Sequence, residues 1–201
     1  MEKKYLVSAL IKFGEKEYME QLLKNGTICM NRLSFYKKHY NQEIQDKNEA
    51  TFYNMPNKDA KIFINGTYIR NNLNGSIKIS NEDYNPLIYC MYAEYINNPI
   101  EYKNKIYIDD RVFNFGESAV IINDPKIFLE RILKYYPNME YSKVRYIDEN
   151  EYKGNMNYFF KYDKYRHQQE YRFVYKNDDN KERLIFDIGS IEDIARIEYF
   201  K

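Results

Sequence analysis

The segment Leu87–Tyr95 reads LIYCMYAEY, an almost unbroken run of apolar and aromatic residues. A run of strand length that lacks the polar alternation of a surface strand is typical of a buried, central strand. The segment Ser118–Ile122 (SAVII) has the same character. We therefore expect these two segments to form the centre of a sheet.

Further strands and two helices are predicted on either side of this centre. One helix spans Glu15–Asn25 and ends at Gly26, and a second is opened by Asp124-Pro125, with Asp124 as its N-cap. The predicted strands are 5–13, 27–36, 61–64, 67–70, 76–80, 142–147, 170–176 and 183–188. The strands 61–64 and 67–70 meet at Asn65-Gly66, a two-residue hairpin turn. The strands 170–176 and 183–188 are expected to form another hairpin through 177–181, and the tail 191–200 to cover an edge of the sheet.

Two segments lack a clear strand or helix pattern. Tyr40–Pro56 is polar and is expected to be a long surface loop, and Met156–Lys164 to be a short helix or an ordered aromatic loop. Many strands and hairpin turns with few helices predict an α+β fold. We expect a mainly antiparallel sheet, either continuous or split into two parts, and two to four helices. The length of 201 residues predicts a single domain, 1–201.

Composition narrows the classes of function. The 31 Lys and Arg balance 30 Asp and Glu, so binding to nucleic acid or to an anionic membrane is not expected. No apolar run reaches the ~20 residues of a membrane span, and no signal peptide pattern is present, so we expect a cytoplasmic protein. The 23 Tyr and the abundant Lys, Asn and Ile indicate an A/T-rich genome, of a bacterium or its phage.

The most informative segment for chemistry is Phe159–Tyr175 (FFKYDKYRHQQEYRFVY). On a strand, Glu170 and Arg172 project to the same face, and Gln168 joins them if the extended conformation starts there. The functional interpretation makes Glu170 a carboxylate that stabilises positive charge on a ribose carbon, with Gln168 orienting a nucleophile or acceptor. The alternative is a solvent-exposed ion pair of little energetic weight.

A second candidate region is the loop that begins near Tyr36 and contains Asp46 and Glu49. The functional interpretation makes this loop one wall of a cleft whose other wall carries Glu170, because long loops in compact domains are often functional. The alternative is a solvated loop in which Asp46 or Glu49 caps a turn.

No metal site is predicted. His39 and His167 lie far apart, and Cys29 and Cys90 occur singly within apolar runs, where a buried, unreactive thiol is expected.

The chain resembles a family of uncharacterised bacterial and prophage proteins. The shared features are Lys12-Phe13-Gly14, the segment NGTICMNRLSFY, the spacing of Asp46 and Glu49, the segment FGESAVII, and YRHQQEYR before FDIGSIEDI.

More distantly, the pattern Gln168-x-Glu170 before a late strand resembles the catalytic triplet of ADP-ribosyltransferases. That resemblance implies a split antiparallel sheet that holds NAD between its halves. It also implies Glu170 as the catalytic glutamate, Gln168 as the residue that presents the acceptor, and Tyr36 as a stacking partner of nicotinamide. On the first strand, where those enzymes hold NAD with Arg or His, this chain offers Lys12.

Two functions therefore stay open. The first is an NAD-consuming, ADP-ribosyltransferase-like protein that acts in phage–bacterium conflict. The second is a phage or prophage protein without turnover that sequesters a nucleotide signal or inhibits a bacterial defence or host protein. The sequence does not indicate an oligomeric state.

Overall fold

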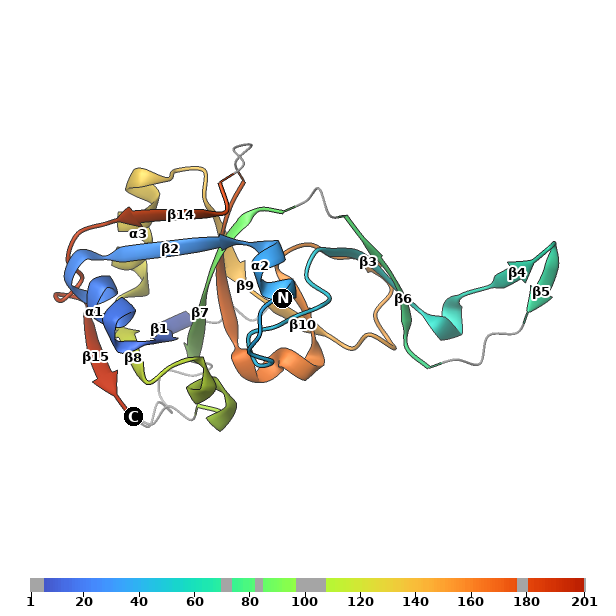
Figure 1. Cartoon of the computed structure of the whole chain (residues 1–201), viewed down its shortest axis with the longest axis horizontal. Coiled ribbons are helices and arrows are strands. Elements are labelled where there is room, and N and C mark those ends of the chain that lie inside the picture. Colours follow the sequence, from blue (N-terminus) through green and yellow to red (C-terminus); the bar gives the residue numbers. More distant parts are fainter. Residues whose placement is uncertain (1–5, 70–73, 82–84, 97–107, 177–180, 201) are drawn as a thin grey trace.

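The computed structural model describes residues 6–69, 74–81, 85–96, 108–176 and 181–200. Its largest sheet is built around strand β7 (Leu87–Ile96), as the apolar run predicts. The strand order is β14 (Arg183–Asp187), β2 (Thr27–Arg32), β7, β1 (Leu6–Gly14), β8 (Ser118–Ile122) and β15 (Ala195–Tyr199). All of these pairs are antiparallel (Figure 1).

Strand β7 carries three neighbours, and this splits the sheet. On one edge, residues 87–92 pair with β13 (Glu170–Tyr175), which also pairs with β9 (Glu140–Lys143). On the other edge, β2 pairs only with 87–88 and β1 only with 92–96. Strands β1 and β2 therefore separate beside residues 89–91, and we call this point the fork.

Two helices cover one face of the sheet. Helix α1 (Lys16–Asn25) buries Met19 and Leu22, and helix α3 (Pro125–Tyr135) buries Phe128 and Ile132. All four side chains belong to one cluster with the centre of the sheet. The Asp124 side chain accepts a hydrogen bond from the Ile127 amide and caps α3 as predicted.

The opposite face carries the shorter elements. The 3-10 helix η2 (Asp110–Phe115) buries Val112 against the β1–β8 side of the sheet. Helix α2 (Leu33–Lys37) follows β2 directly. It buries Leu33 in a hydrophobic cluster that is separate from the cluster of Val112. Strand β12 (Phe160–Tyr162) pairs in parallel with β10 (Arg145–Ile147) and leads into the 3-10 helix η3 (Asp163–Gln168), which ends where β13 begins.

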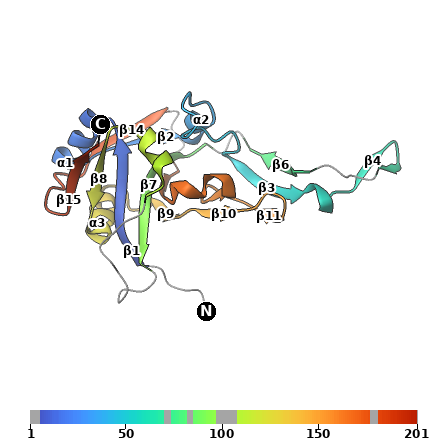
Figure 2. The same cartoon turned by 90° about the horizontal axis from the view of Figure 1, so that it is seen from below.

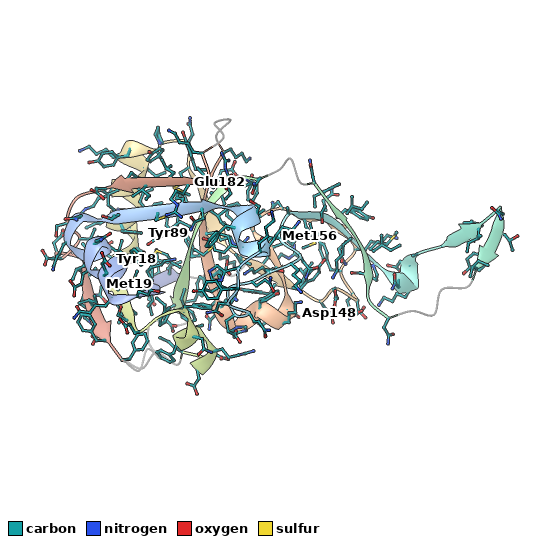
Figure 3. All side chains as sticks on the ribbon, viewed as in Figure 1. Tyr18, Met19, Tyr89, Asp148, Met156 and Glu182 are labelled. Atoms are coloured by element: carbon teal, nitrogen blue, oxygen red, sulfur yellow. The ribbon has the colours of Figure 1, made fainter. Side chains whose placement is uncertain are left out.

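A long arm extends from this body. It consists of β3 (Thr51–Pro56), which pairs with β6 (Ser76–Ser80) and with β11 (Gly154–Asn155), followed by η1 (Asn57–Asp59) and a hairpin of β4 (Ile62–Ile64) and β5 (Thr67–Ile69). Figures 1 and 2 show that this hairpin lies at the far end of the arm. In Figure 3, Tyr89 lies in the body and Met156 where the arm joins it.

The mainly antiparallel α+β class is confirmed, and the described part of the chain holds three α-helices and three 3-10 helices. The predicted turn at Asn65-Gly66 is also confirmed. The tail forms β15 at the edge of the sheet, as expected. None of the described helices has the length and apolar character that a membrane crossing requires.

Several predicted elements were wrong. Strand 27–36 ends at Arg32, because 33–37 turn into α2. The loop 40–56 is neither wholly irregular nor wholly on the surface, since 51–56 form β3 and Asp46, Glu49 and Asn54 are buried. The segment predicted as one strand, 142–147, contributes to β9 and β10.

The predicted hairpin of 170–176 with 183–188 is wrong, because β13 pairs with β7 and β9 whereas β14 pairs with β2. Most of its predicted turn, 177–180, lies outside the described residues, as do Tyr5 and Arg70.

We expect Gly26→Ala to destabilise the protein by about 2–3 kcal/mol. Gly26 ends α1 in the left-handed region (φ 66°), and a Cβ there would lie 2.2 Å from the Gly189 carbonyl oxygen. Gly66→Ala is the matched control, because its φ is also positive (82°) but nothing lies within 4 Å of its Cβ position. Its expected cost is about 1 kcal/mol. Urea unfolding compares the two, and equal costs would refute the contact with Gly189.

Candidate functional site

A cavity of about 170 Å³ lies at the fork. Its walls come from β1, α2, the loop after α2, β7, η2, β12, η3 and β13. The lining side chains are Ile11, Lys12, Phe13, Phe35, Tyr36, His39, Ile44, Glu49, Cys90, Met91, Tyr92, Phe115, Lys161, Gln168, Glu170 and Arg172. A dry cavity of about 150 Å³ accepts a benzene ring, so this one has room for a single six-membered ring.

The polar side of the cavity is a buried network of charges. The Arg172 guanidinium donates from Nε to Glu170 Oε2 (2.7 Å) and from Nη1 to Glu49 Oε2 (3.1 Å) and to the Tyr158 carbonyl oxygen (2.6 Å). Lys161 Nζ donates to Glu170 Oε1 (2.5 Å) and lies 3.7 Å from Glu49. The two cations therefore balance the two carboxylates without water-exposed partners.

This network holds Glu170 ionised. Burial favours the neutral form of its carboxyl, but the fields of Arg172 and Lys161 and their hydrogen bonds outweigh burial and hold the pKa of Glu170 well below its usual range. Burial raises the pKa of the Glu49 carboxyl, and the positive charges of Arg172 and Lys161 offset part of this increase. Glu170 is thus suited to accept hydrogen bonds and to stabilise positive charge, and not to donate a proton at neutral pH.

Gln168 is fixed by the same network. It sits at the end of η3, and Gln169 after it adopts the left-handed conformation (φ 39°), so Gln168 reaches the cavity without lying on the strand. Its Oε1 accepts from Lys161 (2.7 Å), and its Nε2 donates to the Glu43 carbonyl oxygen (2.6 Å). The extended conformation does not start at Gln168, so alternation along a strand does not place it with Glu170 and Arg172, but its side chain still joins them at the cavity.

Lys12 lies in the fork itself. Its Nζ donates to the Cys90 carbonyl oxygen (2.8 Å), which β1 and β2 both leave unpaired at this point, and it lies 4.5 Å from the centre of the Tyr89 ring. Burial lowers the pKa of the Lys12 ammonium, although Cys90 and Glu170 counteract this. Lysine has three N–H donors, and the described part of the chain accepts from one of them, so two can serve a ligand in the cavity.

Much of the remaining lining of the cavity is aromatic. Phe35 packs edge-on against both Tyr36 and His39, with ring centroids 5.3 and 5.0 Å apart. Phe13 packs edge-on against Tyr92, at 6.3 Å. A planar ring that enters the cavity therefore meets both aromatic side chains and members of the charged network.

Cys90 lines the cavity as a neutral thiol. Burial raises its pKa to about 12, so it is protonated at neutral pH, in agreement with the prediction of an unreactive cysteine. No group of three or more potential metal ligands occurs among the residues that the structure describes.

The structure brings together six of the seven residues singled out from the sequence: Lys12, Tyr36, Glu49, Gln168, Glu170 and Arg172. Asp46 is buried but does not line the cavity, and its carboxylate accepts from the Asn48 amide (2.9 Å) within its own turn. The interpretation of Glu170 and Arg172 as an exposed ion pair was wrong, because they are 8% and 1% exposed.

Sequence reasoning missed Lys161, the cation that contacts both Glu170 and Gln168. Lys161 belongs to the three-residue strand β12, which is too short to show an alternating pattern. The aromatic residues that flank Lys161 were noticed, but nothing in their spacing indicates a buried lysine.

No protein-family model matches the chain, and neither does any curated protein or solved structure.

The ionised Glu170 makes stability depend on pH. A carboxyl whose pKa is lowered by folding contributes stability that is present above its unfolded pKa, near 4.3, and is lost as pH falls below it. We expect the unfolding free energy of the wild type to fall more steeply than that of Glu170→Gln between about pH 5 and pH 3, by up to about 1.4 kcal/mol per pH unit. Urea unfolding across this range measures both slopes, and parallel slopes would contradict the assigned ion pairs.

Proposed function

We propose that the cavity at the fork binds a nucleotide through a planar ring, and that NAD is the first ligand to test. The observation that carries this proposal is a ring-sized cavity whose lining combines aromatic side chains with a buried network of ion pairs. Small-molecule sites commonly combine an apolar lining with a few placed polar groups.

The place of the cavity supports the choice of NAD. It lies where β1 and β2 leave the same edge of β7, and a split antiparallel sheet is the form that the resemblance to ADP-ribosyltransferases implies. Lys12 occupies the first-strand position from which a ligand would be held, with donors free for a carboxamide or ring oxygen.

Binding without turnover is the form of the function that the network favours. Lys161 and Arg172 neutralise the charge of Glu170, and the Gln168 amide is tied to Lys161 and to Glu43. A prefolded, neutralised site holds a ligand in one orientation but places little net negative charge on its sugar. Such a site, together with the A/T-rich composition and the resemblance to prophage proteins, supports the proposal of a cytoplasmic anti-defence protein that sequesters a nucleotide signal.

Calorimetric titration with NAD, nicotinamide and AMP tests the proposal. Tyr36→Leu is expected to weaken binding about 5- to 100-fold, because stacking on an aromatic side chain is worth about 1–3 kcal/mol per base. Tyr135→Leu is the control, since Tyr135 lies on α3, outside the cavity lining. Absence of binding for all three ligands, or equal losses in both variants, would refute the site.

ADP-ribosyl transfer is the second candidate, and one observation favours it. Among the described residues, each Glu170 oxygen accepts one hydrogen bond. A carboxylate has about four acceptor positions, so Glu170 can still accept from a ribose hydroxyl. In that reaction the bond from ribose C1′ to the nicotinamide nitrogen breaks, nicotinamide leaves with the electron pair, and water or an acceptor bonds to C1′. Glu170 would stabilise the positive charge on the sugar.

Labelled NAD, incubated with the protein alone and in bacterial lysate, separates the two candidates. Transfer predicts nicotinamide release that falls at least 100-fold in Glu170→Gln and is unchanged in Glu17→Gln. Glu17 is an exposed residue of α1 that stands two positions after Glu15, as Glu170 stands two positions after Gln168, so it controls for the spacing alone. Binding to NAD without release in the wild type would leave the non-catalytic function.

A further inference from the structure

The hairpin at the end of the arm exposes apolar side chains with no core of its own. Phe63 is 60% exposed, Ile64 58%, Tyr68 53% and Ile69 42%. Phe63 and Tyr68 face each other across the two strands, with ring centroids 5.6 Å apart. Ile64 and Ile69 alternate with them and so project to the other face, which makes both faces of the hairpin apolar.

A hairpin of this kind is incomplete by itself. Its strands have three residues each, and a two-stranded hairpin without further packing is marginally stable in water. Four large apolar side chains exposed within eight residues form an apolar surface at the tip of the arm, and exposed apolar surface of this kind marks an interaction site.

The charge of the hairpin indicates the kind of partner. Residues 62–69 (IFINGTYI) contain no charged side chain, so they offer nothing for selection by opposite charge. Two copies of an uncharged surface meet without repulsion. An antiparallel pair of identical strands is also self-complementary about a two-fold axis.

The turn determines which residue would lie on that axis. Asn65 (φ 49°) and Gly66 (φ 82°) are both left-handed, as in a type I′ turn, and the turn closes on the pair Ile64–Thr67. Hydrogen-bonded and non-hydrogen-bonded pairs alternate along an antiparallel ladder, so the N–H and C=O of Phe63 point away from β5. Phe63 therefore presents a donor and an acceptor on the free edge of β4.

We propose that the tip of the arm pairs with the tip of a second copy of this chain, β4 against β4, in an antiparallel register centred on Phe63. In this register the backbone of residue 62 lies opposite 64, and Lys61 lies opposite Asn65, so no lysine faces its own copy. The product is a four-stranded sheet in which two Phe63 rings lie side by side between two Tyr68 rings. This inference is independent of the proposed function.

Sedimentation equilibrium of the full chain, from low to high micromolar concentration, tests the proposal. We expect a reversible dimer in the micromolar range, as is usual for a small interface. Phe63→Glu and Phe63→Lys should each raise the dissociation constant at least tenfold, because like charges meet on the axis. An equimolar mixture of the two variants should associate again, since opposite charges then meet.

Tyr135→Lys is the matched control, an aromatic residue on the body with 52% exposure. Circular dichroism checks that each variant is folded. A wild type that stays monomeric throughout, as it would if a different protein covered the tip, overturns the proposal. So does an effect of Tyr135→Lys equal to that of Phe63→Lys, or a mixture that fails to associate.

Discussion

The ion pairs of Arg172 join the parts of the molecule that make the cavity. The guanidinium connects Glu170 on its own strand, Glu49 on the loop after α2 and the Tyr158 carbonyl oxygen before β12. The residues that carry these groups are only 1–8% exposed, so water does not reach them freely. Removing one member of such a set leaves a buried charge that water cannot stabilise. The loop, β12 and β13 are therefore held in one arrangement, and the cavity keeps its shape without a ligand.

Buried ion pairs give little net stability compared with well-packed apolar residues, so their presence at the fork needs another reason. Around this cavity they fix polar groups in a lining that also contains aromatic side chains, the combination on which the proposed binding of a planar ring rests. The same neutralisation that makes these groups stable weakens their field on a bound sugar. The proposed binding function therefore needs only the lining of the cavity, whereas transfer would depend on the remaining acceptor capacity of Glu170.

The sequence predicted those parts of the fold that depend on local pattern. The apolar run 87–95 marked the central strand, Asp124 and Gly26 marked helix ends, and the alternation of Glu170 with Arg172 placed both on the face that lines the cavity. The partners of each strand were harder to predict from the sequence. Strand β14 is the next strand after β13 along the chain, but β13 pairs with β7 and β9. Lys161 was missed for a related reason: its burial is created by β13 and the loop after α2, and not by its own neighbours.

The residues of the cavity are also far apart along the chain, from Ile11 on β1 to Arg172 on β13. Closing loops of this length costs chain entropy before the contacts that reward it can form, so sheets with such pairings fold slowly. Until β13 docks on β7, Glu170 and Arg172 cannot join Lys161 and Glu49 at the cavity. During synthesis the site is therefore completed after more than four fifths of the chain has emerged, and a product truncated before β13 would lack Glu170 and Arg172.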